Sequence, residues 1–385
     1  MRLVPLAFLV CALPLALGAA ARADGCSPEN CGTQSVALPG SRTLLVRPNG
    51  TQGPLVAYDL ATGKRRFRLP PGMLSSNGRR FVATVPRNGP ETTLARYDAR
   101  SGRLLGALSL SSRGNLVAIS STGRFLVLQR WLRRASVLDV VDTARGAILR
   151  RARLGGSWSV ETISKDGRRL YALQYLRDGY VVRLYDVARG RLVPGALRVK
   201  GEEGPMVGLA WRGLPSPDGR WLLTLFLAST GNEAAIHTLD LGSSSAVCID
   251  LPSRGALQEL QQYGLVLAPS GARVVAVNPV LGVVAVVDLA SKKVVRTTSF
   301  PHVALPRSLS FTIAAASADG RTVYFGLRRS VWAYDAAYGK VRGPYRVGGI
   351  VAGLGFSPNG RRLWVVHVDR RVTALDAARG TPVRG

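Results

Sequence analysis

One eight-residue pattern recurs along this chain of 385 residues. Its clearest copy reads SPDGRWLL and starts at Ser216, and related octets start at positions 75, 120, 164, 268, 317 and 357. Successive starts lie 40 to 52 residues apart, and a weaker copy begins at Leu38. Self-similarity at such a period indicates a repeat architecture, in which each repeat is one supersecondary unit that packs against its neighbours. No other feature of the sequence constrains the fold as strongly.

An aspartate that precedes a turn follows each octet by about 20 residues, as in the segments YDLATGK and YDVARGR. The side chain of Asp at such a position accepts hydrogen bonds from backbone N–H groups of the next few residues. We therefore expect each of these aspartates to cap its own turn. The eight are Asp59, Asp98, Asp142, Asp186, Asp240, Asp288, Asp335 and Asp376.

Each repeat has the pattern of four short strands separated by turns. The octets supply Pro, Asp or Asn, and Gly, which tight turns favour, and the segments between turns are rich in β-branched and aromatic residues. The best helical candidate is a short stretch at 253–264. The pattern predicts an all-β chain that folds as a single β-propeller of eight four-stranded blades, with seven blades as the alternative.

The segments SKDGRRLYAL at 164–173 and VVRLYDVARGRL at 181–192 resemble the YVTN-type and WD-repeat-like propeller repeat of secreted bacterial proteins. The resemblance covers nearly all of residues 34–385. It implies a propeller fold but no particular activity, because propellers host many unrelated functions. The last repeat leaves two ways to complete its blade, since the fourth strand is either TPVRG at 381–385 or an N-terminal strand around residues 34–38.

The N-terminus has the pattern of a secretory signal peptide, with a basic start, an apolar run and small residues that end at Ala23. We expect residues 1–23 to be the signal peptide, residues 24–33 an N-terminal segment and residues 34–385 the propeller. In an exported chain, Cys26 and Cys31 would form a disulfide, with a lipid-anchored Cys26 or a metal-binding pair as the alternatives. The expected location is secreted or the cell envelope, and no transmembrane segment is expected.

The chain is strongly basic, with 52 Lys and Arg against 23 Asp and Glu, which gives a formal net charge of +29. A field of this size attracts polyanions such as anionic lipids or cell-wall polymers. The alternative is a solvated surface that reflects a coding preference for Arg. Arginines that follow the octet glycines, such as Arg79 and Arg80, would form a ring on one face. This arginine ring is a candidate site for a polyanion, and the alternative is a set of solvated residues at strand ends. Because the charge is spread with the repeats, no specific nucleic acid is expected as a partner.

The meander order of the strands assigns each loop to a face. The octet turn and the Asp turn lie on one face, here called the octet face. The loop between the second and third strands and the crossover between blades lie on the other, here called the variable-loop face. Binding residues tend to lie on variable loops held by a rigid scaffold. The predicted ligand-binding residues there are Trp158, Glu161, Glu202, Glu203, Tyr263, His302 and Arg307.

The sequence gives little sign of catalysis. Its three histidines fall in different repeats, and it contains no nucleophile-elbow, phosphate-loop or haem-attachment motif. We expect no catalytic residue, metal or cofactor. The leading hypothesis is a non-catalytic binding scaffold at the cell envelope, whose variable-loop face binds a protein, a glycan or a small ligand. The alternative is a hydrolase of the propeller-lactonase type, with its site in the central funnel around Glu202, Tyr263 and His302.

Overall fold

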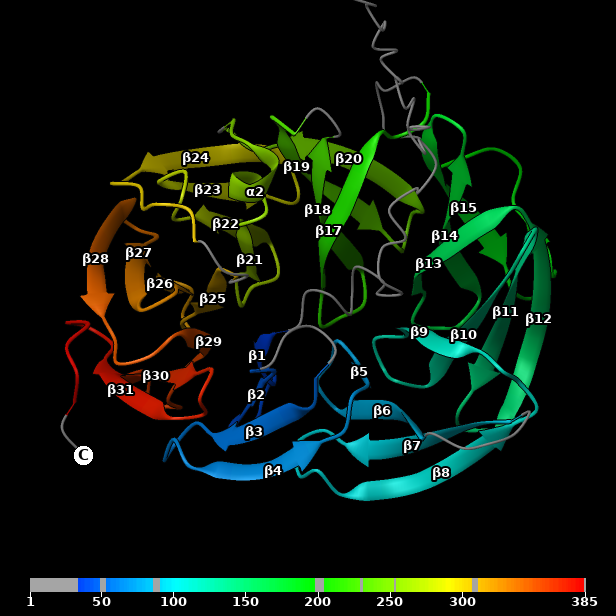
Figure 1. Ribbon diagram of the computed structural model, residues 1–385, viewed down its shortest axis with the longest axis horizontal. Helices are drawn as coiled ribbons and strands as arrows, with labels where there is room; N and C mark the ends of the chain where they lie inside the picture. The colour runs from blue at the N-terminus through cyan, green and yellow to red at the C-terminus, as the bar shows by residue number, and fades with distance from the viewer. Residues whose placement is uncertain are drawn as a thin grey trace, which may run out of the picture.

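The computed structural model describes residues 34–48, 53–85, 91–197, 204–228, 231–252, 254–306 and 311–383. These residues form eight antiparallel sheets that follow one another in chain order around a central axis (Figure 1). The single turn of helix α2 (Leu257–Leu260) lies within the stretch where the sequence suggested a helix. The structure confirms an all-β, single propeller with eight blades rather than seven.

The strands of blades one to four, from the inner to the outer edge of each sheet, are β1 (Ser35–Ala37), β2 (Thr43–Val46), β3 (Leu55–Asp59) and β4 (Arg65–Leu69); β5 (Met73–Leu74), β6 (Arg80–Val85), β7 (Thr92–Asp98) and β8 (Leu104–Leu110); β9 (Asn115–Ile119), β10 (Phe125–Leu132), β11 (Ala135–Asp142) and β12 (Ala147–Gly155); β13 (Ser157–Ile163), β14 (Arg169–Leu176), β15 (Gly179–Asp186) and β16 (Arg191–Leu192). Those of blades five to eight are β17 (Gly208–Pro215), β18 (Trp221–Ala228), β19 (Ala234–Asp240) and β20 (Ser245–Asp250); β21 (Gly264–Leu267), β22 (Arg273–Asn278), β23 (Val283–Asp288) and β24 (Lys293–Ser299); β25 (Ile313–Ala316), β26 (Thr322–Leu327), β27 (Ser330–Asp335) and β28 (Lys340–Arg346); β29 (Val351–Phe356), β30 (Arg362–His367) and β31 (Val372–Asp376).

The octet forms the turn between the first and second strands of its blade. In blade five, the Ser216 hydroxyl donates to Asp218 Oδ1 (2.5 Å) and accepts from the N–H of Trp221 (2.8 Å). Gly219 between them has a φ of 75°, a conformation that disfavours residues with a Cβ. The same serine bonds recur in other blades, as at Ser164 and Ser357. The octet is therefore a structural element rather than a binding site.

All eight aspartates of the second signature cap their own turns, as predicted. Asp376 shows the pattern, because its Oδ1 accepts from the N–H groups of Ala378 (2.9 Å) and Arg379 (2.8 Å). The N–H of Arg379 and then that of Ala378 hold the pKa of the Asp376 carboxyl below its usual value. The same caps form at Asp59, Asp98, Asp142, Asp186, Asp240, Asp288 and Asp335.

Arginines join neighbouring blades through the backbone carbonyls of the Asp turns. Arg150 on the outer strand of blade three donates from Nε to Val187 O (3.1 Å) and from Nη2 to Ala188 O (2.9 Å), in the Asp turn of blade four. We call such a contact an arginine clamp. Five further clamps follow the same rule, namely Arg66 to Arg100, Arg96 to Thr143, Arg169 to Gly242, Arg296 to Ala336 and Arg342 to Ala378.

The ring closes between blades eight and one without an exchanged strand. β1 pairs with β2, so residues 35–37 are the inner strand of blade one and do not complete blade eight. The C-terminal segment instead lies along β31, where the N–H of Val383 donates to Ala374 O (2.9 Å). The two blades meet where Trp364 Nε1 donates to Leu60 O (2.6 Å) and where the N–H of Leu354 donates to the Ser35 hydroxyl.

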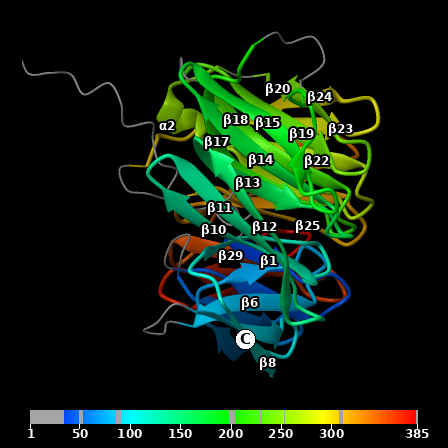
Figure 2. The same cartoon turned by 90° about the vertical axis from the view of Figure 1, so that its right-hand side faces the viewer.

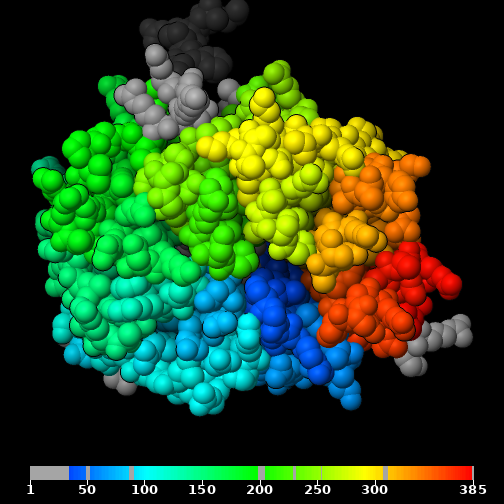
Figure 3. All heavy atoms as spheres, turned by 180° about the vertical axis from the view of Figure 1, so that it is seen from behind, coloured from blue at the N-terminus to red at the C-terminus, as the bar shows by residue number. Residues whose placement is uncertain are grey.

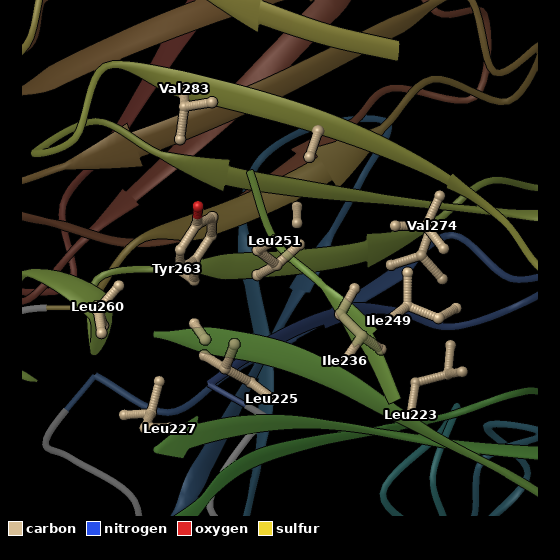
Figure 4. Packing of buried hydrophobic residues seen from close by; sticks show 14 of the residues in the cluster. Leu223, Leu225, Leu227, Ile236, Ile249, Leu251, Leu260, Tyr263, Val274 and Val283 are labelled. Carbon is tan, nitrogen blue, oxygen red and sulfur yellow. The ribbon is translucent and has the colours of Figure 1, made fainter. Parts of the chain in front are cut away.

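The hydrophobic core lies between blades rather than within one layer. Leu223 and Leu225 of blade five pack with Val274 and Val283 of blade six, as Figure 4 shows for this cluster. Helix α2, which belongs to a crossover, projects on the side that faces the viewer in Figure 1 (Figure 2). Figure 1 therefore looks onto the variable-loop face, and Figure 3 shows the octet face, with the blades in chain order around it. Of the described helices, none is long and apolar enough to cross a bilayer.

The arginine clamps generate a prediction about stability. Arg150→Lys keeps the charge but cannot place two donors on the adjacent carbonyls of Val187 and Ala188, so we expect the free energy of unfolding to fall by about 1 to 2 kcal/mol. Arg153→Lys on the same strand is the matched control, because Arg153 is exposed and makes no clamp. Its effect should stay within about 0.5 kcal/mol. Urea unfolding of both variants tests this, and equal effects would show that the clamp contributes nothing.

Candidate functional site

Two of the predicted binding residues, Trp158 and Glu161, lie on the inner strand β13 and are buried. The Trp158 indole donates to Gly155 O (2.7 Å), and its ring packs in the cluster between blades three and four. The ladder between β13 and β14 skips from Val160 to Thr162, which places Glu161 in a bulge. Neither side chain lies on an open rim, because blades pack against both faces of this sheet.

Burial without a cationic partner raises the pKa of Glu161 to about 8. The hydrogen-bonding capacity of its Oε1 is unused among the described residues. Burial raises the pKa of Tyr180 strongly, and the charge of Glu161 raises it further, so the two groups lie near each other. Tyr180 in turn contacts Phe226 of blade five at 6.2 Å between ring centroids. Glu161 therefore faces the seam between blades four and five.

Of the remaining predicted residues, the structure describes Tyr263 and His302, and these two differ in burial. Tyr263 is fully buried in the core between blades five and six (Figure 4), whereas His302 is exposed on the crossover between blades six and seven. Glu202, Glu203, Arg307, Cys26 and Cys31 lie outside the described residues. The described ranges contain no group of three His, Cys, Asp or Glu side chains that could hold a metal ion. The ligand-binding role of these residues stays a prediction.

Several arginines on the octet face form hydrogen bonds or ion pairs with other residues of the propeller. Besides the clamps, an arginine after the octet glycine pairs with the turn aspartate of its own blade, as Arg124 does with Asp142 (2.9 Å). The hydrogen bond from Arg124 is the first cause that lowers the pKa of Asp142. Similar pairs join Arg42 to Asp59, Arg80 to Asp98 and Arg220 to Asp240. Exposed pairs contribute little to stability, but they reduce the charge that a polyanion would meet on this face.

A different group of arginines stands on blade three. β10 and β11 pair along all eight residues and are joined by Arg133 and Arg134, so this hairpin extends far toward the variable-loop face. Five exposed arginines of this region make no side-chain ion pair or hydrogen bond with another described residue. We call them the blade-three cluster, and they are Arg113, Arg130, Arg133, Arg134 and Arg153.

The strand register brings members of the blade-three cluster together. Val137 pairs with Arg130 on one side and with Arg153 on the other, so the three side chains share the sheet face toward blade two. A cavity of about 170 Å³ opens on this face and is lined by Arg113 and Arg130, among others. The exposed Leu132 at the hairpin end adds apolar surface on the same sheet face, whereas Trp131 faces blade four, where its Nε1 donates to Trp158 O (3.0 Å).

One carboxylate lies in this cavity, and it is already neutralised. Asp139 accepts from Arg151 through Nε (2.6 Å) and Nη2 (3.1 Å) and from the Ser112 hydroxyl (2.6 Å). Hydrogen bonding to Asp139 raises the pKa of Arg151. The charge of Asp139 is thus used within blade three, which leaves the five cluster arginines as uncompensated positive charge.

A second cavity, of about 120 Å³, lies on the central axis between the inner strands of blades one, two, five, six and seven. Its polar lining includes Arg47, Arg212 and Thr312, and its apolar lining includes Leu74 and Leu265. The sequence did not single out any of these residues. Their positions in the repeats differ from blade to blade, so no repeated motif marks them.

Comparisons with known proteins support the fold alone. The solved structure of dihydro-haem d1 dehydrogenase NirN in complex with DHE has a TM-score of 0.54 and 18% identity, over 93% of this chain and 78% of that one. A eukaryotic initiation factor has a TM-score of 0.51 and 12% identity, over 91% of this chain and 86% of that one. No family model and no curated protein matches the chain. The fold is therefore a β-propeller of eight blades, and the likeness to YVTN-type or WD-repeat-like sequences stays a resemblance.

Burial of Glu161 predicts a specific pH dependence of stability. With a pKa of about 8 in the folded state and an ordinary value of 4.5 when unfolded, Glu161 takes up a proton on folding between these pH values. Its contribution to wild-type stability therefore falls as pH rises from 5 to 8, by up to about 1.4 kcal/mol per pH unit. Glu161→Gln should remove this loss, so the stability of the variant relative to wild type should increase with pH.

Urea unfolding at pH 5, 6.5 and 8 measures the difference. The exposed Glu91→Gln is the control, because it makes the same substitution at a solvated position. A Glu161→Gln variant whose stability relative to wild type did not change with pH would contradict the buried, protonated carboxyl group.

Proposed function

We propose that this protein is a non-catalytic binding scaffold whose variable-loop face binds a polyanion through the blade-three cluster. The observation that carries the proposal is the set of five exposed arginines on blade three without a described side-chain partner, two of which, Arg113 and Arg130, line one cavity. Guanidinium groups bind phosphate and carboxylate oxygens in a bidentate fashion, and neighbouring ones bind successive groups of a polymer. The N-terminal signal pattern makes an envelope polymer with phosphate or carboxylate groups the expected partner.

The charge of the blade-three cluster is not required for the fold of the ring. On the octet face, several arginines are held by turn carbonyls and turn aspartates, such as Arg150 and Arg124, so a polyanion that bound them would compete with bonds that stabilise the fold. The cluster arginines are solvated, and binding would replace only water and counterions. Leu132 would add an apolar contact to the less polar parts of the same partner.

The hydrolase alternative finds less support. Tyr263 is buried between two blades, where a substrate would not reach it, and His302 is exposed on a crossover. The solved structures that share the fold include an enzyme and a translation factor, so the fold itself favours neither activity nor its absence.

A charge-matched pair of variants tests the proposal. The triple variant Arg130→Gln, Arg133→Gln and Arg134→Gln should weaken binding of inorganic polyphosphate at 0.1 M salt by at least tenfold. It should also make the plot of log affinity against log salt shallower by about 2 to 3, because three phosphate contacts are lost. Fluorescence titration at several salt concentrations measures both quantities.

The control carries the same loss of charge on the opposite face. Arg79→Gln, Arg168→Gln and Arg361→Gln remove three exposed arginines beside the octet turns, and this variant should keep affinity within about twofold of wild type. If the two triple variants weakened polyphosphate binding equally, the attraction would be a property of net charge and the blade-three site would be refuted.

A further inference from the structure

The cavity on the axis is narrowed at its octet end. The Ser76 hydroxyl of blade two donates across the axis to Ser216 O of blade five (2.8 Å). The N–H of Asn77 donates to Ser121 O of blade three (3.1 Å). Ser76 lines the cavity at this end. These contacts between blades border the axial cavity at this end, and its volume of about 120 Å³ has room for several waters or one small organic molecule.

Two buried arginines line the other end of the cavity. Arg47 is 6% exposed and donates to Gly53 O (2.8 Å) and Gly72 O (3.1 Å). Arg212 is 7% exposed, and its Nη1 donates to Thr312 O (3.0 Å). The Arg212 guanidinium also lies 5.2 Å from the centroid of the Phe311 ring. These contacts fix both cationic groups in place beside a space that they share.

The cavity is electrostatically suited to an anion. None of the described residues that line it is acidic. Charges interact more strongly in a buried site than in water, so an anion between two guanidinium groups would be held more firmly than on the surface. Positions fixed in advance also reduce the ordering that binding requires.

A buried hydroxyl provides independent evidence of a missing ligand group. Thr312 is 1% exposed and lines the cavity, and its Oγ1 has no hydrogen-bond partner among the described residues. Buried hydroxyl groups are nearly always hydrogen-bonded, and one left without a partner lowers stability. A ligand oxygen beside Arg212 would accept from this hydroxyl.

Part of the cavity wall is apolar. Val36, Leu74, Leu265 and Ile313 face the same space as the two arginines. Inorganic anions would leave this surface in contact with water, whereas a short hydrocarbon chain would cover it. The wall therefore favours an anion that also carries a few carbon atoms.

We propose that the axial cavity binds a small organic monocarboxylate, with its carboxylate held by Arg47 and Arg212 and by the Thr312 hydroxyl. Its short apolar chain lies against Leu74 and Leu265. This site is separate from the blade-three cluster, and the proposal does not rest on polyanion binding.

Isothermal titration calorimetry with butyrate tests the site, with butyramide as the neutral analogue and inorganic phosphate as the anion without a chain. Butyrate should bind at one site per chain, and the other two should bind at least tenfold more weakly. Thr312→Val should weaken butyrate binding by about tenfold, because a hydrogen bond to a charged group is lost. Arg212→Gln should abolish binding.

Stability in the absence of ligand separates a binding role of Thr312 from a structural one. Because the hydroxyl is unpartnered, ligand-free Thr312→Val should melt at the temperature of wild type or above it. A lower melting temperature would show that the hydroxyl serves the fold. The variant Arg130→Gln, Arg133→Gln and Arg134→Gln should bind butyrate as wild type does. Equal binding of butyrate and butyramide, preference for phosphate, or no butyrate binding would each overturn the proposal.

Discussion

The backbone carbonyls of the Asp turns hold the blades of this ring in register. Each turn aspartate accepts from N–H groups inside its own turn, as Asp186 does from Arg189, so the turn keeps one shape in every blade. Its carbonyls then point out of the blade, where the clamp of the preceding blade reaches them. Apolar clusters between blades supply most of the burial, but they are not directional. The clamps add direction, and the six described ones fix the offset of a blade from the next at six of the eight seams.

The blade count and the octet face could be predicted because their chemistry is local. The bonds of an octet lie within six residues, as from Ser216 to Trp221, and those of an Asp turn lie within four. The clamps were missed because donor and acceptor lie one repeat apart, as Arg150 and Val187 do at a separation of 37 residues. A signal was present nonetheless. Arginine recurs seven or eight residues after the turn aspartate in the fourth strands that carry Arg66, Arg150, Arg296 and Arg342.

The candidate site was harder to predict because the length of a loop does not indicate whether the residues next to it are buried. Trp158 and Tyr263 follow crossovers in the sequence, which placed them on a rim, but each packs between two blades. Neighbouring blades cover both faces of a propeller sheet. The alternation of apolar and polar residues along a strand therefore does not distinguish a buried face from an exposed one. Outer strands are exposed along their length, whereas residues of the inner and middle strands reach solvent mainly where they extend beyond the end of a neighbouring blade. The blade-three cluster reaches solvent because β10, β11 and β12 are long. The recurring octet and Asp turn mark the ends of strands on one face only, so they do not indicate how far a strand extends toward the other face.

Three groups of described arginines therefore differ in their availability to a partner. Those in clamps and turn pairs, such as Arg150 and Arg124, are bound to carbonyls and carboxylates that the ring itself supplies. Buried arginines on the axis are fixed around a small cavity. Exposed arginines on blade three are held by neither. A formal charge of +29 consequently overstates what the surface offers to a polyanion. Because the ring-forming bonds lie on the octet face, the variable-loop face can change its residues without loss of the fold, and this separation allows one scaffold to carry both a surface site and an axial one.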